Sequence, residues 1–411
     1  MKRLALLLLL TSVPAGAQAR LDDSDLSGRG FSPASIRRLD LEGRQEALSR
    51  VFVVTPAAKA AAAPQAGRIN AVLALLDRDG SRHPARLAKV RLSGSGAPAA
   101  WTEADAAGAL SIAAPAGLSG SYRLRFSLDN RFWVFRNPSD SAYEWESPAF
   151  TLPAPAGLDL GTLSPEPGSE NGKLGVLHLT YLQALDFLKT NADVDWWQKP
   201  LTVNWPGSSD YFSPWSWSLE LTNAMAWDVV LHELGHAVMH GSMRAESAGG
   251  QHKIDGCYSP ALAWSEGWAT FFAAAVRLPR GDADAKFEYL VPRRAPIRLE
   301  NVPEDVCRGQ SNEWRVAAGL WDLYDTHEDG GDGFGLDFGV LFKPLQGQSM
   351  GSIGSAWQLI AKGLDGGQRK AGEAALAWNT LLPARELNVL LPATPADWLR
   401  TAPWASRPSR R

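Results

Sequence analysis

Residues 227–236 read Trp-Asp-Val-Val-Leu-His-Glu-Leu-Gly-His, and this stretch carries the strongest chemical signal in the chain. His232 and His236 are four positions apart, so a helix places both imidazoles on one face, one turn from each other. Two imidazoles in that arrangement can converge on one zinc ion, with Glu233 projecting beside them. A chance match in a chain of this length and composition is on the order of one in two hundred. Two surface histidines that share this spacing by coincidence are the alternative, but the apolar residues around them favour a buried helix and a metal site.

A catalytic zinc ion also needs a third protein ligand and an open position for water. The metzincin arrangement requires glycine at position 239 and histidine at 242, where this chain has Met239 and Ser242. A helix predicted over residues 260–277 carries instead one acid, Glu266, among apolar residues. We expect Glu266 to bind the metal, because an unpaired buried carboxylate is costly, and a surface acid is the alternative. Gly267 beside it leaves room where two helices would meet.

The motifs His-Glu-Leu-Gly-His and Ser-Glu-Gly-Trp-Ala resemble those of the gluzincin metallopeptidases, the thermolysin-like and fungalysin-like clan. The resemblance covers residues 170–400 and is specific around these two motifs. It implies that His232, His236 and Glu266 are the ligands of a Zn²⁺ ion. It also implies that Glu233 is the general base, which accepts a proton from water and passes it to the leaving amine of a cleaved peptide bond.

An orienting acid and a substrate-binding edge strand are further features of these families. The acid is often an aspartate four residues after the ligand glutamate, where this chain has Thr270, so the partner that orients the ligand histidines is left unassigned. The edge strand precedes the first metal helix and binds the substrate backbone. Here it is expected near residues 214–219, with Trp215 and Trp217 on one face, although core packing is the alternative role for at least one of these rings.

Peptide hydrolysis also needs a group that stabilises the negative charge on the carbonyl oxygen. A helix predicted over residues 312–324 and the loop after it offer three candidates. Arg315 falls near the place where fungalysin-like sequences put such a residue, and Tyr324 and His327 follow it. A packed tyrosine and a solvated loop histidine are the alternatives.

Two other features resemble metal-binding elements. His240 lies two turns beyond His232, but it has drifted off the line of the two ligands, so we expect a structural role. Residues 325–333 are acidic and Gly-rich, as a Ca²⁺-binding loop is, yet they do not match the EF-hand spacing, and a plain turn is the alternative.

The beginning of the chain has the make-up of a signal peptide over residues 1–19, with a basic start, a short apolar run and a small-x-small cleavage site. We therefore expect a secreted or periplasmic protein without a membrane span, because the apolar run is too short for a transmembrane helix. Residues 20–65 are polar and then Ala/Pro-rich, which indicates a linker or a pro-segment.

Short β-rich runs separated by turn signals fill residues 66–165 and predict an all-β sandwich. The candidate strands cover residues 68–76, 88–92, 110–113, 122–128 and 132–135. This layout resembles the transthyretin-like or carboxypeptidase-regulatory-like accessory domains of exported proteins. The resemblance implies a spacer or a docking domain, with a glycan or a cell surface as the partner it could contact.

The composition limits the partners and the redox state. The chain of 411 residues has 41 Lys plus Arg against 44 Asp plus Glu, and it contains no long basic run, which argues against a nucleic-acid binder. Its 17 tryptophans suggest that some rings line a groove. The two cysteines, Cys257 and Cys307, are expected to form a disulfide in an oxidising compartment.

The sequence thus predicts a multidomain exported protein, in which the all-β sandwich precedes an α+β zincin-like metallopeptidase domain over residues 166–400 and a disordered tail over 401–411. Its substrate would be a peptide or a protein. The rival is a non-catalytic glycan- or protein-binding protein with a structural zinc site, where a fourth ligand such as His240 or His252 is expected. A zinc hydrolase that acts on something other than peptides is a third interpretation.

Overall fold

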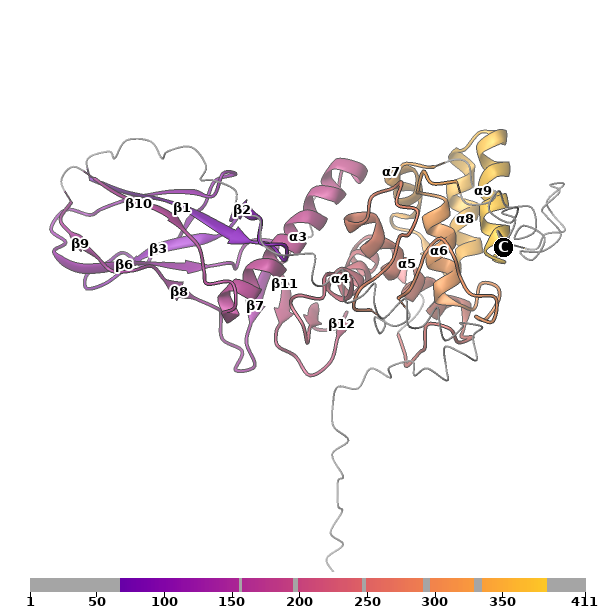
Figure 1. The fold of residues 1–411 in the computed structure, drawn as a ribbon, viewed down its shortest axis with the longest axis horizontal. Coiled ribbons are helices and arrows are strands. Elements are labelled where there is room, and N and C mark those ends of the chain that lie inside the picture. Colours follow the sequence, from indigo (N-terminus) through magenta and orange to yellow (C-terminus); the bar gives the residue numbers. More distant parts are fainter. Residues whose placement is uncertain are drawn as a thin grey trace, which may run out of the picture.

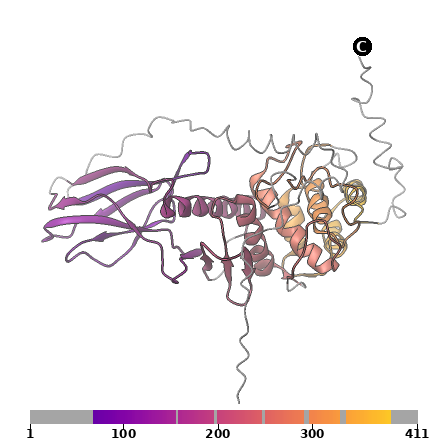
Figure 2. The ribbon, with the colours of Figure 1, turned by 60° about the horizontal axis from the view of Figure 1, so that its bottom comes forward.

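The computed structural model of this chain describes residues 67–154, 157–194, 199–245, 249–290, 296–328 and 335–382. A strand-rich region comes first and a helical region follows, and the two lie end to end (Figure 1). Helix α3, Glu170–Ala192, runs from the strand-rich region toward the other helices, as Figure 2 shows. The predicted signal peptide, linker and C-terminal tail lie outside the described residues.

The strand-rich region contains two sheets. One has the order β10-β1-β2 with β5 also paired to β1, and the other has the order β4-β3-β6-β8 with β9 also paired to β6. Alternate residues of these strands are buried, as Val90 and Leu92 are in β3, which is the pattern of a sheet with one face on a core. The strands are β1 Arg68–Leu76, β2 Arg82–Pro84, β3 Lys89–Ser93, β4 Thr102–Glu103, β5 Ala109–Ala113, β6 Gly120–Ser127, β8 Trp145–Glu146, β9 Phe150–Leu152 and β10 Leu158–Leu163.

Strand β7, Trp133–Arg136, pairs differently from the expectation that it belongs with the strands before it. It lies parallel to β11, Leu201–Asn204, at one edge of a third sheet with the order β12-β13-β11-β7. The reason is its aromatic side chains, which are fully buried against α3. The ring centroids of Trp133 and Phe135 lie 5.5 and 6.1 Å from that of Tyr181. The chain therefore enters the third sheet before the strand-rich region is complete.

The other edge of the third sheet is β12, Tyr211–Ser213. It pairs antiparallel with β13, Ser218–Glu220, and residues 214–217 form the turn between them. The expected edge strand near 214–219 is therefore wrong, because β13 is covered on one side by β11 and on the other by β12. Trp217 is buried, and Trp215 is 96% exposed in the turn. The Trp217 ring thus packs in the core, whereas the Trp215 ring points into solvent, so the two do not lie on one face of a strand.

Three helices carry the candidate site, and the middle one, α5 Pro260–Arg277, packs against both α4 Trp227–Ser242 and α6 Glu313–Asp322. Helix α5 begins as the sequence predicts, with the Ser259 side chain accepting from the Leu262 N–H and proline at the first turn. Glycines allow the close approach of the helices. A Cβ atom on Gly235 would lie 2.9 Å from Ala269 Cα, and one on Gly267 would lie 2.5 Å from Val316 Cγ1.

Further short elements complete the helical region. They are α7 Phe338–Phe342, α8 Ile353–Ile360, α9 Gly366–Trp378, the 3₁₀ turns η1 Lys343–Leu345 and η2 Ala361–Gly363, and the paired strands β14 Arg244–Ala245 and β15 Ser349–Met350. Within the described part of the chain, no helix combines the length and the apolar character needed to cross a membrane.

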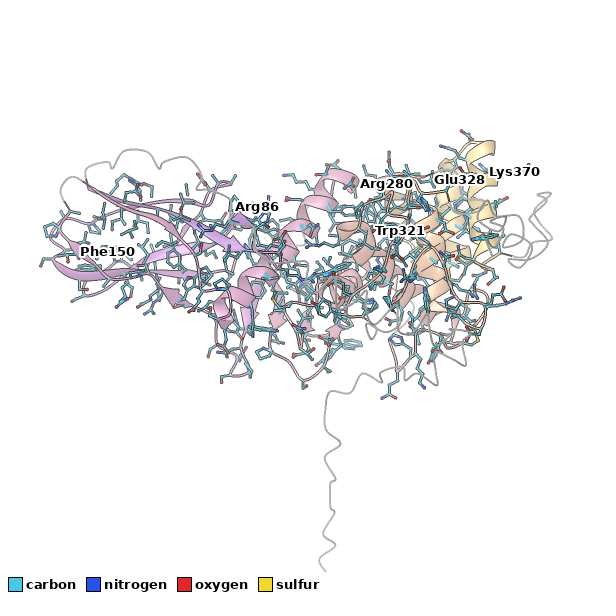
Figure 3. All side chains as sticks on the ribbon, viewed as in Figure 1. Arg86, Phe150, Arg280, Trp321, Glu328 and Lys370 are labelled. Atoms are coloured by element: carbon cyan, nitrogen blue, oxygen red, sulfur yellow. A yellow bond between two sulfur atoms is a disulfide. The ribbon has the colours of Figure 1, made fainter. Side chains whose placement is uncertain are left out.

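His178 of α3 joins the strand-rich and helical regions. Trp133 Nε1 donates a hydrogen bond to its Nδ1 at 3.2 Å, and its Nε2 lies 3.0 Å from the Arg86 carbonyl oxygen. Because a carbonyl can only accept, Nε2 carries the ring proton. Burial lowers the pKa of His178 to about 4. Arg86, labelled in Figure 3, also forms an ion pair with Asp186 of the same helix.

Candidate active site

Three metal-binding atoms from α4 and α5 lie close together. His232 Nε2 is 3.2 Å from Glu266 Oε2, and His236 Nε2 is 3.1 Å from the same oxygen. Donor atoms of the three residues all lie within 4.8 Å of one another, and the side chains of His232 and Glu266 are 8% and 6% exposed. The close packing of α4 on α5 at Gly235 brings together residues that are thirty positions apart in the sequence.

The spacing of these donors fits a tetrahedral zinc site. With zinc bonds of about 2.0–2.1 Å, two corners of a tetrahedron lie roughly 3.3–3.4 Å apart. The observed separations of 3.1 and 3.2 Å are close to that value. Burial opposes ionisation of Glu266, but the neighbouring imidazoles outweigh it and hold the pKa of this carboxyl well below its usual range. Two imidazole nitrogens and one charged oxygen are a donor set that suits zinc with a fourth position open.

Hydroxyl groups lie beside the other ring nitrogens of both histidines. His232 Nδ1 lies 3.1 Å from Thr270 Oγ1, and His236 Nδ1 lies 3.4 Å from Ser265 Oγ. If each Nδ1 donates to its hydroxyl, each Nε2 presents a lone pair to the metal position. Thr270 stands where the gluzincin sequences that the motifs resemble often have aspartate, and its hydroxyl offers His232 a neutral oxygen in place of a carboxylate.

Glu233 is buried, and together with the two histidines it lines a cavity of about 240 Å³. Burial raises the pKa of Glu233 to about 7. The cavity lies between α4, α5, the β12–β13 hairpin and the loop after α4. Its lining residues are Asp210, Tyr211, Phe212, Pro214, His232, Glu233, His236, Met239, His240, Gly249, Gly250, His252, Ser265 and Glu266.

His252 lines this cavity from the loop after α4, and it contacts two carboxylates. Its Nδ1 lies 2.7 Å from Glu313 Oε2 of α6, and its Nε2 lies 3.5 Å from Glu266 Oε2. The Glu313 side chain is 5% exposed, and its Oε2 makes no hydrogen bond of good geometry, so the contact with His252 is an ion pair. The Glu313 carboxylate raises the pKa of His252. Sequence reasoning named His252 only as a ligand of a structural zinc, because a histidine in an irregular loop has no spacing pattern.

The structure separates the potential metal-binding residues into two groups. One contains His232, His236 and Glu266, and the other contains His252, Glu266 and Glu313. His252 is therefore not a fourth member of the first group. His240, the other candidate for a fourth ligand, packs instead against the rings of Phe212 and Trp217, with centroids 5.7 and 6.1 Å away.

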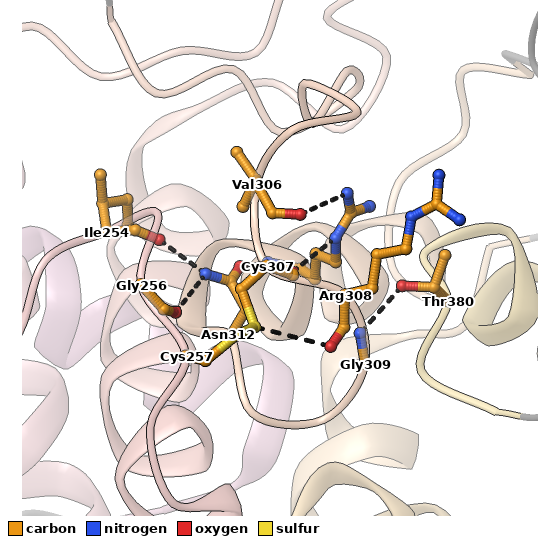
Figure 4. Close-up of a disulfide and its surroundings, with 10 residues drawn as sticks. Ile254, Gly256, Cys257, Val306, Cys307, Arg308, Gly309, Asn312 and Thr380 are labelled. Carbon is orange, nitrogen blue, oxygen red and sulfur yellow. Dashed lines mark hydrogen bonds between the residues drawn. A yellow bond between two sulfur atoms is a disulfide. The ribbon is translucent and has the colours of Figure 1, made fainter. Parts of the chain in front are cut away.

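The loop that carries His252 is fixed to the start of α6. The predicted disulfide between Cys257 and Cys307 is confirmed, with a Cα–Cα distance of 5.4 Å. Figure 4 shows the Asn312 side chain, the N-cap of α6, donating to the carbonyl oxygens of Ile254 and Gly256. These contacts hold the segment after His252 beside the helix that carries Glu313.

The three residues predicted to stabilise the carbonyl oxygen are not among the described residues that line the cavity. The Arg315 guanidinium donates to the carbonyl oxygens of Pro303, Val306 and Cys307, so it is used in holding the disulfide loop. Tyr324 packs among aromatic rings under Arg280, which is the alternative role of a packed tyrosine. His327 lies in a loop, where its backbone N–H donates to Asp325 Oδ2. The structure thus places none of the three side chains at the described wall of the cavity.

The predicted Ca²⁺ loop is only partly visible. Residues 329–334 lie outside the described part of the chain. In the part that is described, Asp325 Oδ2 accepts the backbone N–H of His327, which is an ordinary turn contact.

Comparison with known proteins gives one match to this part of the chain. A family model described as the mycolysin C-terminal domain matches residues 190–337, which include α4, α5 and α6. The match supports a thermolysin- or fungalysin-like metallopeptidase context for these residues and suggests a protease family. No curated protein matches the chain.

The solved structures that match the chain include one with only a slight likeness to it. It is the crystal structure of a 9R-lipoxygenase from Cyanothece PCC8801, 15% identical over 39% of this chain and 27% of that chain, with a TM-score of 0.16. The present chain thus spans 27% of that protein's length. A likeness at this level carries no argument about fold or function.

Proposed function

We propose that this protein is an exported, zinc-dependent peptidase of the gluzincin kind, with a zincin-like helical region and an accessory β-sandwich. The observation that supports it most directly is the convergence of His232, His236 and Glu266 at the wall of a cavity that Glu233 also lines. The mycolysin match over the same helices agrees with this assignment.

The protein's own residues divide the work of peptide hydrolysis. His232, His236 and Glu266 would hold the metal, and a zinc ion bound there would act as a Lewis acid on the scissile carbonyl and lower the pKa of water. Glu233 projects from the same helix into the cavity, where it accepts the proton of the attacking water and returns it to the leaving amine. A single carboxylate can serve both steps because the proton that it accepts from water in the first step is the proton that it gives to the amine in the second.

The edge strand β12 supplies a binding surface for an extended peptide. Asp210, Tyr211 and Phe212 line the cavity, and β12 ends the sheet on this side among the described strands. An extended substrate can add to such an edge through backbone hydrogen bonds. An exposed strand edge beside the cavity favours a peptide over other hydrolysable substrates. In this proposal β12 takes the role that the sequence analysis gave to residues 214–219.

The rival function, a binding protein with a structural zinc, is less well supported. A structural zinc site is closed by four protein ligands. The described residues supply three donors in the group that contains His232, and His252 belongs to a different group. Glu233 would also have no purpose beside a closed site.

The test is Glu233→Gln, which removes the proton acceptor but none of the proposed ligands. We expect the variant to bind one zinc per chain, as the parent does, and to lose casein and peptide hydrolysis. Glu103→Gln is the matched control, because Glu103 is exposed on β4 in the strand-rich region. Hydrolysis by Glu233→Gln at the parental rate would show that the assigned role is wrong.

A further inference from the structure

The cavity contains a second charged pair, His252 with Glu313, that the proposed mechanism has not used. We infer that His252 is a catalytic residue whose Nε2 contacts the scissile carbonyl oxygen of a bound peptide, and that Glu313 is the positioning residue that holds the ring for this contact. This inference rests on the proposed function, since it assigns a role within peptide hydrolysis.

The position of His252 supports the contact with substrate. Its Nε2 lies 3.5 Å from Glu266 Oε2, the oxygen on which both histidines of α4 converge, and its side chain is 29% exposed. A carbonyl oxygen that enters the cavity beside these donors therefore has an imidazole nitrogen next to it. The Arg315 guanidinium donates to three backbone carbonyls and Tyr324 packs among aromatic rings, and neither of these residues nor His327 is among the described residues that line the cavity.

Other donors that line the cavity are less suitably placed. The Ser265 hydroxyl lies against His236 Nδ1, and His240 packs on two aromatic rings at the far end of α4. Tyr211 is 47% exposed on the edge strand, and a hydrogen bond from a solvent-exposed hydroxyl is weaker than one made in a buried site. Among the described lining residues, His252 is the donor that is both partly buried and adjacent to the group of three.

Glu313 is placed to orient the ring. Its carboxylate is nearly fully buried, lies 2.7 Å from His252 Nδ1, and comes from the first turn of α6. In an ion pair with this carboxylate the ring is the imidazolium, so Nδ1–H faces Glu313 and Nε2 also carries a proton that it can donate to an oxygen in the cavity. The disulfide and the Asn312 contacts fix the loop against α6, so both partners are held before a substrate arrives. Such preorganisation is what makes a stabilising donor effective.

The same residues could instead bind a second metal ion together with Glu266, and the geometry disfavours this. The imidazole directs its two nitrogens toward two different carboxylates, whereas one ion would need a single nitrogen to face both. The separation of 2.7 Å is also shorter than the roughly 3.3 Å between ligands of one tetrahedral ion. Metal counting decides between the two interpretations.

The experiment compares His252→Leu, Glu313→Gln and the control His83→Leu, in which an exposed histidine of β2 is replaced. Three quantities are measured on the full chain: zinc per chain, kcat and KM on a peptide, and the inhibition constant of a phosphinic peptide that mimics the tetrahedral transition state. We expect one zinc per chain in every variant. For His252→Leu, which removes the donor, we expect kcat to fall about 100-fold or more with KM little changed, and inhibitor binding to weaken in parallel.

Glu313→Gln should show the same pattern at about 10-fold, because the ring is retained but held less firmly. The inference is overturned if kcat of His252→Leu stays within a factor of two of the parent, or if its activity returns on adding zinc, which would make His252 a metal-site residue. It is equally overturned if the parent holds two ions per chain. These outcomes differ from a failure of the proposed function, in which the parent itself does not cleave peptides.

Discussion

Acidification should destabilise this protein through one buried histidine at the junction of its two regions. His178 accepts a hydrogen bond from Trp133 at Nδ1, and its Nε2 faces the Arg86 carbonyl. Protonation would place a second proton on Nδ1, opposite the Trp133 N–H, inside a fully buried pocket. The perturbation is therefore a drop in pH. The variant His178→Gln should not respond to it at this position, because glutamine stays uncharged.

The size and sign follow from the pKa of His178, about 4 in the folded protein against 6.5 as the ordinary value. Because the folded value is the lower one, the unfolded chain binds the proton more readily between these limits. The stabilising contribution is complete above pH 6.5 and is lost as the pH falls toward 4. The gap between the two values corresponds to about 3 kcal/mol in the free energy of unfolding.

Urea denaturation followed by tryptophan fluorescence at pH 7 and pH 4 measures this contribution. The parent should lose about 3 kcal/mol more between these pH values than His178→Gln does. His83→Gln, with its exposed histidine, should keep the parental pH dependence. If the parent and His178→Gln show the same slope of stability with pH, the assignment of a neutral, hydrogen-bonded His178 is refuted.

Three further predictions concern the packing and the ligands of the site. Thr270→Val removes the hydroxyl beside His232 Nδ1 and should weaken zinc binding by about 10-fold to 100-fold in a competition assay with a chelator. Gly267→Ala places a methyl group against Val316 and should destabilise the fold by about 1–3 kcal/mol, seen as a lower Tm. Cys257→Ser opens the 50-residue loop closed by the disulfide and should cost up to about 4 kcal/mol in urea denaturation.

Each of these variants has a matched control. Thr270→Ser keeps the hydroxyl and should retain parental zinc affinity, and equal affinities for the Val and Ser variants would count against the orienting contact. Gly168→Ala meets nothing within 4 Å of its new Cβ atom and should leave the Tm unchanged, in contrast to Gly267→Ala. For the disulfide, treating the parent with a reductant should reproduce the loss seen in Cys257→Ser, and a stability unaffected by reduction would contradict the prediction.

The local signals in the sequence identified the parts of the site that lie on regular helices. The spacing of His232 and His236 fixes their common face, and the lone acid Glu266 on a capped apolar helix marks the third donor. Gly267 was predicted to admit a neighbouring helix, and the structure shows Val316 of α6 against it. The two cysteines, alone in the chain, left one pairing within it.

Contacts between distant segments could not be predicted in the same way. His252 contacts Glu313 because the disulfide and Asn312 fix an irregular loop to α6. The loop sequence has no periodic pattern from which this contact could be predicted. Strand β7 joins the third sheet because its aromatic residues pack on α3, which short-range alternation cannot reveal. Arg315 was assigned from its position along the chain alone, and its guanidinium proved to be used by three backbone carbonyls.

Zinc content is the most direct test of the account, measured on the purified parent and on Glu266→Ala after dialysis against a weak chelator and reloading. The account predicts one zinc per chain in the parent, almost none in Glu266→Ala, and full occupancy in the control Glu103→Ala. Equal zinc content in the parent and in Glu266→Ala would contradict it, since the carboxylate on which both imidazoles converge would then play no part in holding the metal.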